Sequence, residues 1–339
     1  MKKNINFALI GYGRIGKKHA KIIQENEKCN LAAIVDINNN LRSSDKISST
    51  TYFKDLKDLF ESNVEIDVAV IATPNNLHSS NSLECLSNNC HIVVEKPMAL
   101  TKIEAEKIIK KSNEVKRNVF VVMQNRFSPP LSWIKKILDK KILGKVYLVQ
   151  LSCFWNRDNR YYKNHEWHGK KNLDGGTLFT QFSHYIDLLY WLFGDITNIV
   201  SKLKNFNHNE TIEFEDSGFI TFDFKNGGSG AMNYSTSVAG ENFESSLSII
   251  AQNGTIKIGG QYMDKLEYCN IKEFDTSESL CLNPDETNHT YKGSSQNHYY
   301  IYENVINVLN NNIEIKTGAF DGMKVTEIIE KIYENSNLK

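Results

Sequence analysis

The sequence predicts an α/β protein with two domains. Residues 1–122 should form a doubly wound parallel sheet, and residues 123–339 an α+β domain with a large open mixed, mostly antiparallel sheet. Apolar runs alternate with amphipathic stretches in the first third, a glycine-rich turn follows the first run, and later segments alternate polar with apolar residues. Alternating strands and helices build parallel sheets, whereas polar-apolar alternation is typical of antiparallel strands with one buried face.

The first element is a strand over residues 5–10, INFALI, followed by a glycine-rich turn and a helix. The turn consists of Gly11, Tyr12, Gly13, Arg14, Ile15 and Gly16. Gly11 allows a tight turn, Gly13 lets the backbone approach a pyrophosphate, and Gly16 lets the helix pack closely on the sheet. The helix directs its N-terminal N–H groups at the phosphates. The pattern therefore predicts a dinucleotide pocket of the Rossmann type.

Asp36 ends the second predicted strand, LAAIVD, about twenty residues after the glycines. A carboxylate in this place accepts hydrogen bonds from both hydroxyls of the adenosine ribose and repels a 2′-phosphate. We therefore expect NAD, and not NADP, as the cofactor.

The first domain continues with further strands and helices. The strands are expected within residues 64–73, 91–97 and 118–125, and the helices over 56–60, 78–87 and 101–117. Thr101 should cap the last of these helices, because Glu104 follows three residues later. Doubly wound sheets bind ligands off the carboxyl ends of their strands. The expected cofactor pocket therefore adds these residues to the turn: Asp36, Thr73, Pro74, Asn75, His78, Glu95, Lys96 and Gln124.

The second domain follows a different pattern. We expect helices over residues 129–144 and near 177–193, and strands within 145–155, 214–224, 227–238, 243–260 and 263–270. The strands alternate polar with apolar residues, so one face of their sheet should pack on helices. Self-association would cover the other face, and we expect a homodimer or homotetramer.

Composition excludes several other classes of protein. The chain has 339 residues, with 40 basic and 40 acidic side chains, so neither a nucleic acid nor a membrane is an expected partner. The apolar stretch near the start of the sequence is too short for a signal sequence, and we expect a cytoplasmic enzyme. Six scattered cysteines include no C-x-x-C pair, and His165 with His168 lacks a third ligand nearby, so no metal site is expected.

Four motifs stand out along the chain: the glycine turn with His19, Ala72-Thr73-Pro74-Asn75 before His78, Glu95-Lys96-Pro97, and Gly175-Gly176 followed by His184 and Asp187. Together they resemble the motifs of the glucose-fructose oxidoreductase / inositol dehydrogenase (Gfo/Idh/MocA) family. The resemblance spans nearly the whole chain. It implies an NAD(P)-dependent oxidoreductase of sugars or cyclitols, with a Rossmann domain and a C-terminal mixed sheet that often forms dimers or tetramers.

The resemblance also implies two catalytic residues. Lys96 matches the family lysine beside the nicotinamide and the reacting hydroxyl, and His184 matches a histidine of the second domain. We assign His184 as the general base and Lys96 as its electrostatic partner, and the reverse assignment stays open. Many relatives carry an aspartate where this chain has Thr180, so Gln181 is expected to replace part of its hydrogen bonding, and Asp187 matches a further family position.

A basic and aromatic set of residues should bind the substrate. It comprises Arg126, Arg157, Arg160, Tyr161, Tyr162 and Trp167, joined by Thr180, Gln181 and Asp187. Fixed cations and stacking faces suit an anionic sugar or a nucleotide diphosphate.

This set, with residues 293–298, resembles the UDP-N-acetylglucosaminuronate 3-dehydrogenase branch of the family. That branch oxidises the C3 hydroxyl of a UDP-linked acetamido sugar in bacterial surface-polysaccharide synthesis, and some members use 2-oxoglutarate as a reoxidant. Two alternatives stay open. One is a dehydrogenase of UDP-N-acetylglucosamine or of a free sugar or inositol, and the other is a non-catalytic NAD-binding regulator.

Overall fold

The chain forms two compact units in a computed structural model that describes residues 4–38, 47, 49–163, 166–274 and 297–337. Met1–Met123 and His298–Thr326 make up the first unit, and Gln124–Asn297 and Glu327–Lys339 make up the second. Each unit contains one sheet.

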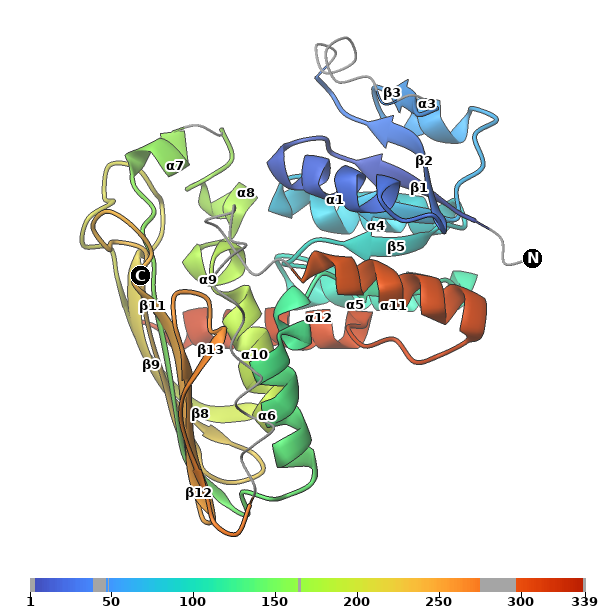
Figure 1. Ribbon diagram of the computed structural model, residues 1–339. Coiled ribbons are helices and arrows are strands. Elements are labelled where there is room, and N and C mark those ends of the chain that lie inside the picture. The colour runs from blue at the N-terminus through green and yellow to red at the C-terminus, as the bar shows by residue number, and fades with distance from the viewer. Residues whose placement is uncertain (1–3, 39–46, 48, 164–165, 275–296, 338–339) are drawn as a thin grey trace. The chain divides into compact units, whose positions relative to one another are not determined.

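The first unit is built on a six-stranded sheet in which all strands run parallel. In sheet order the strands are β3 (Thr51–Phe53), β2 (Cys29–Val35), β1 (Ile5–Ile10), β4 (Val68–Ile71), β5 (His91–Val94) and β6 (Val119–Val121). The chain reverses its direction of progress between β1 and β4, and the crevice at such a switch point is where doubly wound sheets bind ligands. The predicted parallel sheet is confirmed (Figure 1).

Helices connect these strands. They are α1 (Arg14–Gln24), α3 (Leu56–Phe60), α4 (His78–Ser87) with the short η1 (Asn75–Leu77) before it, and α5 (Lys102–Val115). The predicted capping box of α5 is present, since the hydroxyl of Thr101 accepts from the N–H of Glu104 and the carboxylate of Glu104 accepts from the N–H of Thr101. The helices predicted over residues 78–87 and 101–117 thus correspond to α4 and α5.

Two helices from the end of the chain also contribute. They are α11 (His298–Asn311) and α12 (Ala319–Glu334), of which α11 and α12 up to Thr326 belong to the first unit. The sequence placed residues 298–326 in the second domain, and the structure corrects this. Tyr302 is fully buried, its ring lies 5.7 Å from that of Phe7 in β1, and its hydroxyl lies 2.7 Å from Nδ1 of His19. No local pattern reveals such a contact.

The second unit contains a seven-stranded sheet. In sheet order the strands are β13 (Lys265–Ile271), β12 (Gly254–Gly259), β11 (Glu244–Ala251), β7 (Val146–Phe154), β10 (Ser229–Ser235), β9 (Ser217–Phe224) and β8 (Ile196–Lys204). Neighbouring strands are antiparallel except β7 and β10, which are parallel. The predicted mixed, mostly antiparallel sheet is confirmed.

Helices pack on one face of this sheet. The helices are η2 (Gln124–Phe127), α6 (Pro129–Asp139), α7 (Asn159–Lys163), α8 (Lys171–Asp174), α9 (Thr177–Thr180) and α10 (Ser183–Phe193). The ring of Tyr185 in α10 lies 5.8 Å from that of Trp155, and Phe193 lies 5.0 Å from Phe224 of β9. Figure 1 shows α10 and α6 beside the sheet. These contacts bury the apolar side chains of α10 against the strands.

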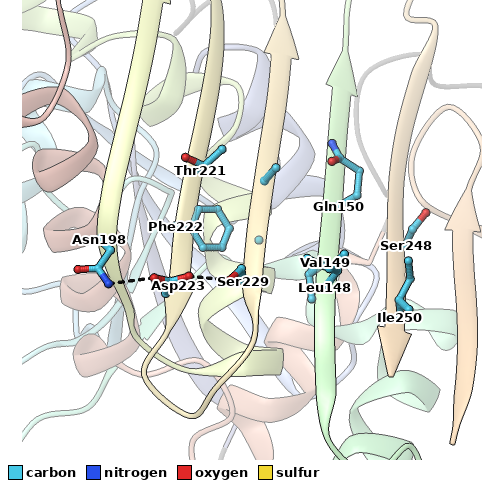
Figure 2. Close-up of a pocket in the computed structure, with 12 residues that line it drawn as sticks. Leu148, Val149, Gln150, Asn198, Thr221, Phe222, Asp223, Ser229, Ser248 and Ile250 are labelled. Carbon is cyan, nitrogen blue, oxygen red and sulfur yellow. Dashed lines mark hydrogen bonds between the residues drawn. The ribbon is translucent and has the colours of Figure 1, made fainter. Parts of the chain in front are cut away.

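The opposite face of the sheet, here called the open face, carries exposed apolar side chains. Leu148, Val200, Phe219 and Ile250 are exposed there. A shallow pocket of about 580 Å³ lies on this face over β7, β9, β10 and β11 (Figure 2). At its edge the carboxylate of Asp223 accepts from Asn198 and Ser229. Among the described helices, none combines the length and the apolar character that a bilayer span requires.

Candidate active site

The glycine turn has the geometry that the sequence predicted. Gly11 has a φ of +93°, and a Cβ there would lie 2.6 Å from the carbonyl oxygen of Ala72. A Cβ on Gly16 would lie 2.1 Å from the carbonyl oxygen of Gly11, whereas one on Gly13 would meet nothing within 4 Å. Gly11 and Gly16 are therefore required by the fold itself. Gly13 leaves an open cradle, where a closely bound pyrophosphate would fit.

The residues around this cradle suit NAD. Asp36 follows β2, and its carboxylate accepts from the backbone N–H groups of Tyr12, at 2.6 Å, and Asn38, at 2.8 Å. These bonds fix the carboxylate beside the turn, where it can also accept from ribose hydroxyls. Helix α1 has no side-chain cap and no acidic residue in its first turn, which contains Arg14 and Ile15. Its first N–H groups and helix dipole therefore favour an anion.

A second segment that the sequence assigned to the cofactor follows β4. Asn75 is buried in η1, and the hydroxyl of Thr73 accepts from the side chain of Asn81 at 3.1 Å. His78 was also expected to contact the cofactor, but it is 1% exposed. Its Nδ1 lies 2.7 Å from the carbonyl oxygen of Pro97, and its Nε2 lies 2.8 Å from that of Thr73. His78 thus joins the loops that follow β4 and β5, and this favours a structural role.

Lys96 lies two residues after the end of β5 and is half-buried, whereas the neighbouring Glu95 is 6% exposed. One carboxylate oxygen of Glu95 lies 3.0 Å from Nε2 of His19, and the other accepts from the backbone N–H of Lys96 at 3.1 Å. Burial would raise the pKa of Glu95, but hydrogen bonds from His19 and His298 hold it well below its usual value. Glu95 is therefore buried and ionised. Its hydrogen bond to the backbone of Lys96 favours a role in holding Lys96 over contact with a cofactor.

His184 begins the first turn of α10 in the second unit and is 4% exposed. Its Nε2 lies 3.1 Å from the amide nitrogen of Gln124. An amide nitrogen only donates, so Nε2 is an acceptor and the proton of neutral His184 is on Nδ1. Gln124, which the sequence assigned to the cofactor pocket, thus lies in the second unit beside the predicted base. His184 presents a basic nitrogen, as proton abstraction requires.

Arg126 and Asp187 form a buried ion pair. Nε of Arg126 lies 2.9 Å from Oδ2 and 3.1 Å from Oδ1 of Asp187, and Nη2 lies 2.5 Å from Oδ1. Their side chains are 5% and 1% exposed. The sequence assigned both residues to substrate binding, whereas this pairing favours a structural role that joins η2 to α10.

Arg157 differs from the other arginines of the predicted substrate set. Its guanidinium lies over the rings of Trp155, at 4.8 Å, and Tyr161, at 5.2 Å. One of its nitrogens donates to Asn242 at 3.1 Å, but the Nε N–H group is buried without a hydrogen-bond partner among the described residues. A buried donor without a partner is costly, so this group is suited to an acceptor on a ligand.

The aromatic residues near Arg157 separate into two groups. Tyr161 is half-buried, stacks on His168 at 4.5 Å, and accepts from the amide of Gln181 at 2.9 Å. Trp167 is half-buried and meets the same histidine edge to face. Tyr162 is 3% exposed in an apolar cluster with Ile212 and Phe214, which favours packing over substrate contact.

Arg160 and Thr180 also have partners within the second unit. The side chain of Arg160 is 86% exposed and pairs with Asp158. The hydroxyl of Thr180 donates to the carboxylate of Asp174, which is fully buried and accepts from the N–H of Gly169 at 2.7 Å. The sequence interpretation did not name Asp174. A carboxylate therefore lies beside Thr180.

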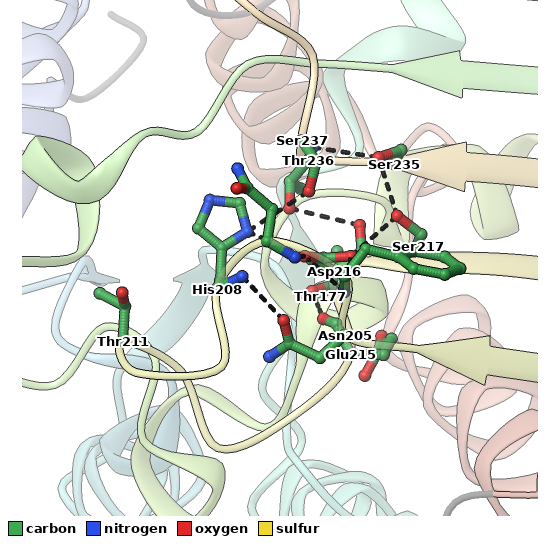
Figure 3. A network of polar contacts seen from close by, with 12 residues as sticks. Thr177, Asn205, His208, Thr211, Glu215, Asp216, Ser217, Ser235, Thr236 and Ser237 are labelled. Atoms are coloured by element: carbon green, nitrogen blue, oxygen red, sulfur yellow. Dashed lines mark hydrogen bonds and ion pairs between the residues drawn. The ribbon is translucent and has the colours of Figure 1, made fainter.

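The sequence interpretation also missed two acidic residues before β9. Glu215 is fully buried and accepts from the hydroxyls of Tyr234, at 2.9 Å, and Tyr333, at 2.8 Å. Burial raises the pKa of Glu215 to about 7. Asp216 accepts from His208 at 3.1 Å and from the hydroxyl of Ser217 at 2.8 Å, in the polar network of Figure 3. Their two-residue run, ED, gave no sign of burial.

The described residues contain no group of three or more histidine, cysteine, aspartate or glutamate side chains arranged to hold a metal ion. His165 lies outside the described residues, and His168 packs against Tyr161 and Trp167. The Nδ1 atom of His168 also lies 3.2 Å from the carbonyl oxygen of Tyr161. His168 is therefore surrounded by aromatic side chains and a backbone carbonyl group.

Known structures and sequences resemble this chain over most of its length. The WlbA dehydrogenase from Bordetella pertussis, in complex with NADH and UDP-GlcNAcA, is 29% identical with a TM-score of 0.89, covering 98% of this chain and 96% of that one. The corresponding protein of Chromobacterium violaceum is 27% identical with a TM-score of 0.90, covering 99% and 94%. A scyllo-inositol 2-dehydrogenase (NADP(+)) of Bacillus subtilis is 24% identical, covering 81% and 78%.

Both domains also match one family. Residues 5–123 match the oxidoreductase family with an NAD-binding Rossmann fold, and residues 132–257 match the GFO/IDH/MocA C-terminal domain. Together these matches include the whole first sheet, most of the second sheet and the segments that carry Lys96 and His184. The chain therefore belongs to the Gfo/Idh/MocA family of NAD-dependent oxidoreductases.

Proposed function

We propose that this chain oxidises the C3 hydroxyl of a UDP-linked N-acetamido sugar, UDP-N-acetylglucosaminuronate, to the 3-keto sugar in bacterial surface-polysaccharide synthesis. The observation that carries the proposal is the likeness over almost the whole chain to WlbA from Bordetella pertussis, a structure with bound NADH and UDP-GlcNAcA. Lys96, His184 and Arg157 support it, because each has the chemistry that the reaction needs.

His184 is the proposed general base. Its Nε2 atom accepts from Gln124 in the structure, so this nitrogen carries a lone pair that can take the proton of an alcohol. A substrate hydroxyl would take the place of the Gln124 amide at that lone pair. Lys96 is the proposed electrostatic partner of this base. NAD, when bound, accepts the hydride from the carbon.

Arg157 is the proposed anion-binding residue. Two aromatic rings and Asn242 hold its guanidinium, and its Nε N–H group is available to a carboxylate or phosphate oxygen. A planar guanidinium binds such groups through charge-assisted hydrogen bonds. Arg160 is the matched control, because it is exposed and paired with Asp158.

The first experiment mixes the purified protein with UDP-N-acetylglucosaminuronate and NAD, with and without 2-oxoglutarate. Reduced nicotinamide is followed by absorbance and the sugar by mass. Loss of two hydrogens from the sugar supports the proposal, and turnover that requires 2-oxoglutarate identifies it as the reoxidant. No reaction, together with oxidation of UDP-N-acetylglucosamine or a free sugar, would disprove the uronate substrate.

Substitutions then test the roles of the residues. Lys96→Ala and His184→Ala should each lower kcat by at least about 100-fold, as loss of acid-base catalysts does. Arg157→Gln should raise KM for the uronate more than KM for UDP-N-acetylglucosamine, and Arg160→Gln should change neither. A chain that keeps its biological activity after loss of Lys96 and His184 would be a non-catalytic NAD-binding regulator.

A neutral substrate is the second candidate. It is favoured by the 24% identity to an inositol dehydrogenase, which acts on an uncharged cyclitol. Competition by UDP alone separates the two, because a nucleotide-sugar enzyme binds UDP and an inositol enzyme does not.

We also propose that the protein is a homodimer or homotetramer joined through the open face. Leu148, Phe219 and Ile250 expose apolar area there to solvent, and pairing would bury it. The mass of the protein in solution tests this proposal.

A further inference from the structure

A buried polar network in the first unit joins α1, the end of β5 and α11 around the carboxylate of Glu95. His19 is fully buried, His298 is 1% exposed and Tyr302 is fully buried. His19 Nε2 lies 3.0 Å and His298 Nε2 lies 3.7 Å from Oε1 of Glu95. The other oxygen accepts from the N–H of Lys96. Burial of this many polar side chains costs free energy of folding, and the glycine turn does not need these side chains to form.

Both histidines of this network direct an N–H group toward Glu95. Lys18 lies 3.0 Å from Nδ1 of His298, and an ammonium only donates, so the proton of His298 is on Nε2, which faces Glu95. Burial lowers the pKa of His298 to about 4, and the ring is neutral at pH 7. The hydroxyl of Tyr302 lies 2.7 Å from Nδ1 of His19, and donation there leaves the His19 proton on Nε2, again facing Glu95.

These contacts hold the ionised carboxylate of Glu95 in one position, next to the backbone of Lys96. Its second oxygen fixes the N–H of Lys96, while His78 holds the carbonyl of the next residue, Pro97, at 2.7 Å. The main chain at Lys96 is thus held on both sides. If Glu95 lost its donors it would take up a proton, and its hold on the N–H of Lys96 would weaken.

We propose that His298 and Tyr302 of α11 are positioning residues for Lys96, acting through His19 and Glu95. The inference rests on the proposed function insofar as Lys96 takes part in dehydrogenation. Helix α11, which lies far from Lys96 in the sequence, would thus help to fix the position of this lysine. Neither residue needs to touch the substrate or the cofactor.

The first test measures how firmly the N–H of Lys96 is held. Hydrogen exchange of the full-length, NADH-bound protein is followed by NMR after ¹⁵N-lysine labelling, with the Lys96 signal assigned by its loss in Lys96→Arg. Tyr302→Phe should speed exchange at Lys96 about tenfold, since it removes the donor that orients His19. Tyr300→Phe, on the exposed face of the same helix, should leave the rate unchanged. Equal rates in wild type and Tyr302→Phe would overturn the inference.

The second test uses the shape of the replacement at His298. A glutamine amide reaches the position of Nε2 and can still donate to Glu95, whereas an asparagine amide reaches only the position of Nδ1. His298→Asn should lower kcat about tenfold, and His298→Gln should stay within about threefold of wild type. The Kd of NADH should change less than about threefold in both. A rise in the Kd of NADH that matches the loss of kcat would show that the network serves cofactor binding and would overturn the positioning role.

Failure of the proposed function would look different. If wild type oxidises none of the sugars, the proposed function is wrong, and exchange at Lys96 still decides whether α11 positions this residue. If Lys96→Ala keeps full turnover while exchange responds to Tyr302→Phe, the network positions a residue that is not catalytic, and the link to catalysis is disproved.

Discussion

Single residues of the same type have very different environments in this protein. Arg126 is buried against Asp187, Arg157 lies between two aromatic rings with a buried N–H group, and Arg160 extends into solvent beside Asp158. In the sequence all three arginines lie near aromatic residues, and all three were assigned to substrate binding. Pairing and burial depend on residues far away in the chain, so only the structure separates a structural arginine from one suited to a ligand.

Removal of the Arg126 side chain should destabilise the fold. Arg126→Ala leaves the carboxylate of Asp187 buried without its partner, and the free energy of unfolding should fall by about 3–5 kcal/mol. Urea denaturation at pH 7 measures this change. Arg160→Ala is the control and should alter it by less than about 0.5 kcal/mol, as exposed substitutions do. A small effect of Arg126→Ala would return this residue to the substrate-binding set.

Glu215 should make stability depend on pH. Its pKa of about 7 in the folded protein exceeds that of an unfolded glutamate, so its contribution is fully present below about pH 4.5 and is lost as pH rises to about 7. Glu215→Gln keeps an acceptor for Tyr234 and Tyr333 but has no proton to lose. Relative to wild type, the variant should gain roughly 3 kcal/mol in free energy of unfolding between pH 4.5 and 7.

Urea denaturation of both proteins across this pH range measures the gain. A difference between them that does not change with pH would mean that Glu215 is ionised in the folded protein throughout.

At the scale of elements, strong local signals gave accurate predictions. The strand INFALI became β1, and the Thr101 capping box begins α5. Weak or interrupted signals did not. β3 has only three residues, and β8 contains a register shift and a positive φ at Asn198, which break its alternation. The helix predicted near residues 177–193 is divided into α9 and α10.

The candidate site follows the same rule. Gly11 and Asp36 could be named from the sequence because the spacing of the glycine turn identifies them, and Lys96 because it matches a family motif. Asp174, Glu215 and His298 gained their partners through tertiary contacts, and an isolated acid or histidine gives no sign of burial. The sequence therefore identifies residues that belong to a motif more readily than residues whose partners come from elsewhere in the fold.

The turn between β1 and α1 offers a paired test of cofactor binding. Gly16→Ala places a Cβ 2.1 Å from a backbone oxygen, so α1 must move, and both stability and NADH affinity should fall. Gly13→Ala meets nothing within 4 Å and should fold normally, yet weaken NADH at least about tenfold, because its methyl group occupies the cradle. Thermal melting and fluorescence titration with NADH separate the two effects. Unchanged affinity in Gly13→Ala would place the pyrophosphate elsewhere.

At the scale of the whole molecule, the open face is an apolar surface that the second sheet leaves uncovered in the described part of the chain. Its apolar side chains come from several strands, among them Leu148 of β7, Phe219 of β9 and Ile250 of β11. Strand pairing brings Leu148 and Ile250 together in one row across the sheet. A second copy of the chain is the proposed cover.

A charge on this face should dissociate the assembly. Phe219→Lys introduces a cation into the apolar area that pairing would bury, and the mass measured by light scattering should fall to that of a single chain. Ile103→Lys is the control, because Ile103 is equally exposed but belongs to α5 of the first unit. A wild-type protein that is already monomeric would contradict the proposal.

The return of α11 to the first unit has a consequence for biosynthesis. As the ribosome releases the chain from its N-terminus, β1 to β6 emerge long before Tyr302, so Phe7 and His19 stay exposed during most of translation. Domains of this size otherwise tend to fold as they leave the exit tunnel. In this protein the first unit stays incomplete until residues 298–326 have been synthesised, so its nascent chain should depend on chaperones more than a contiguous Rossmann domain does.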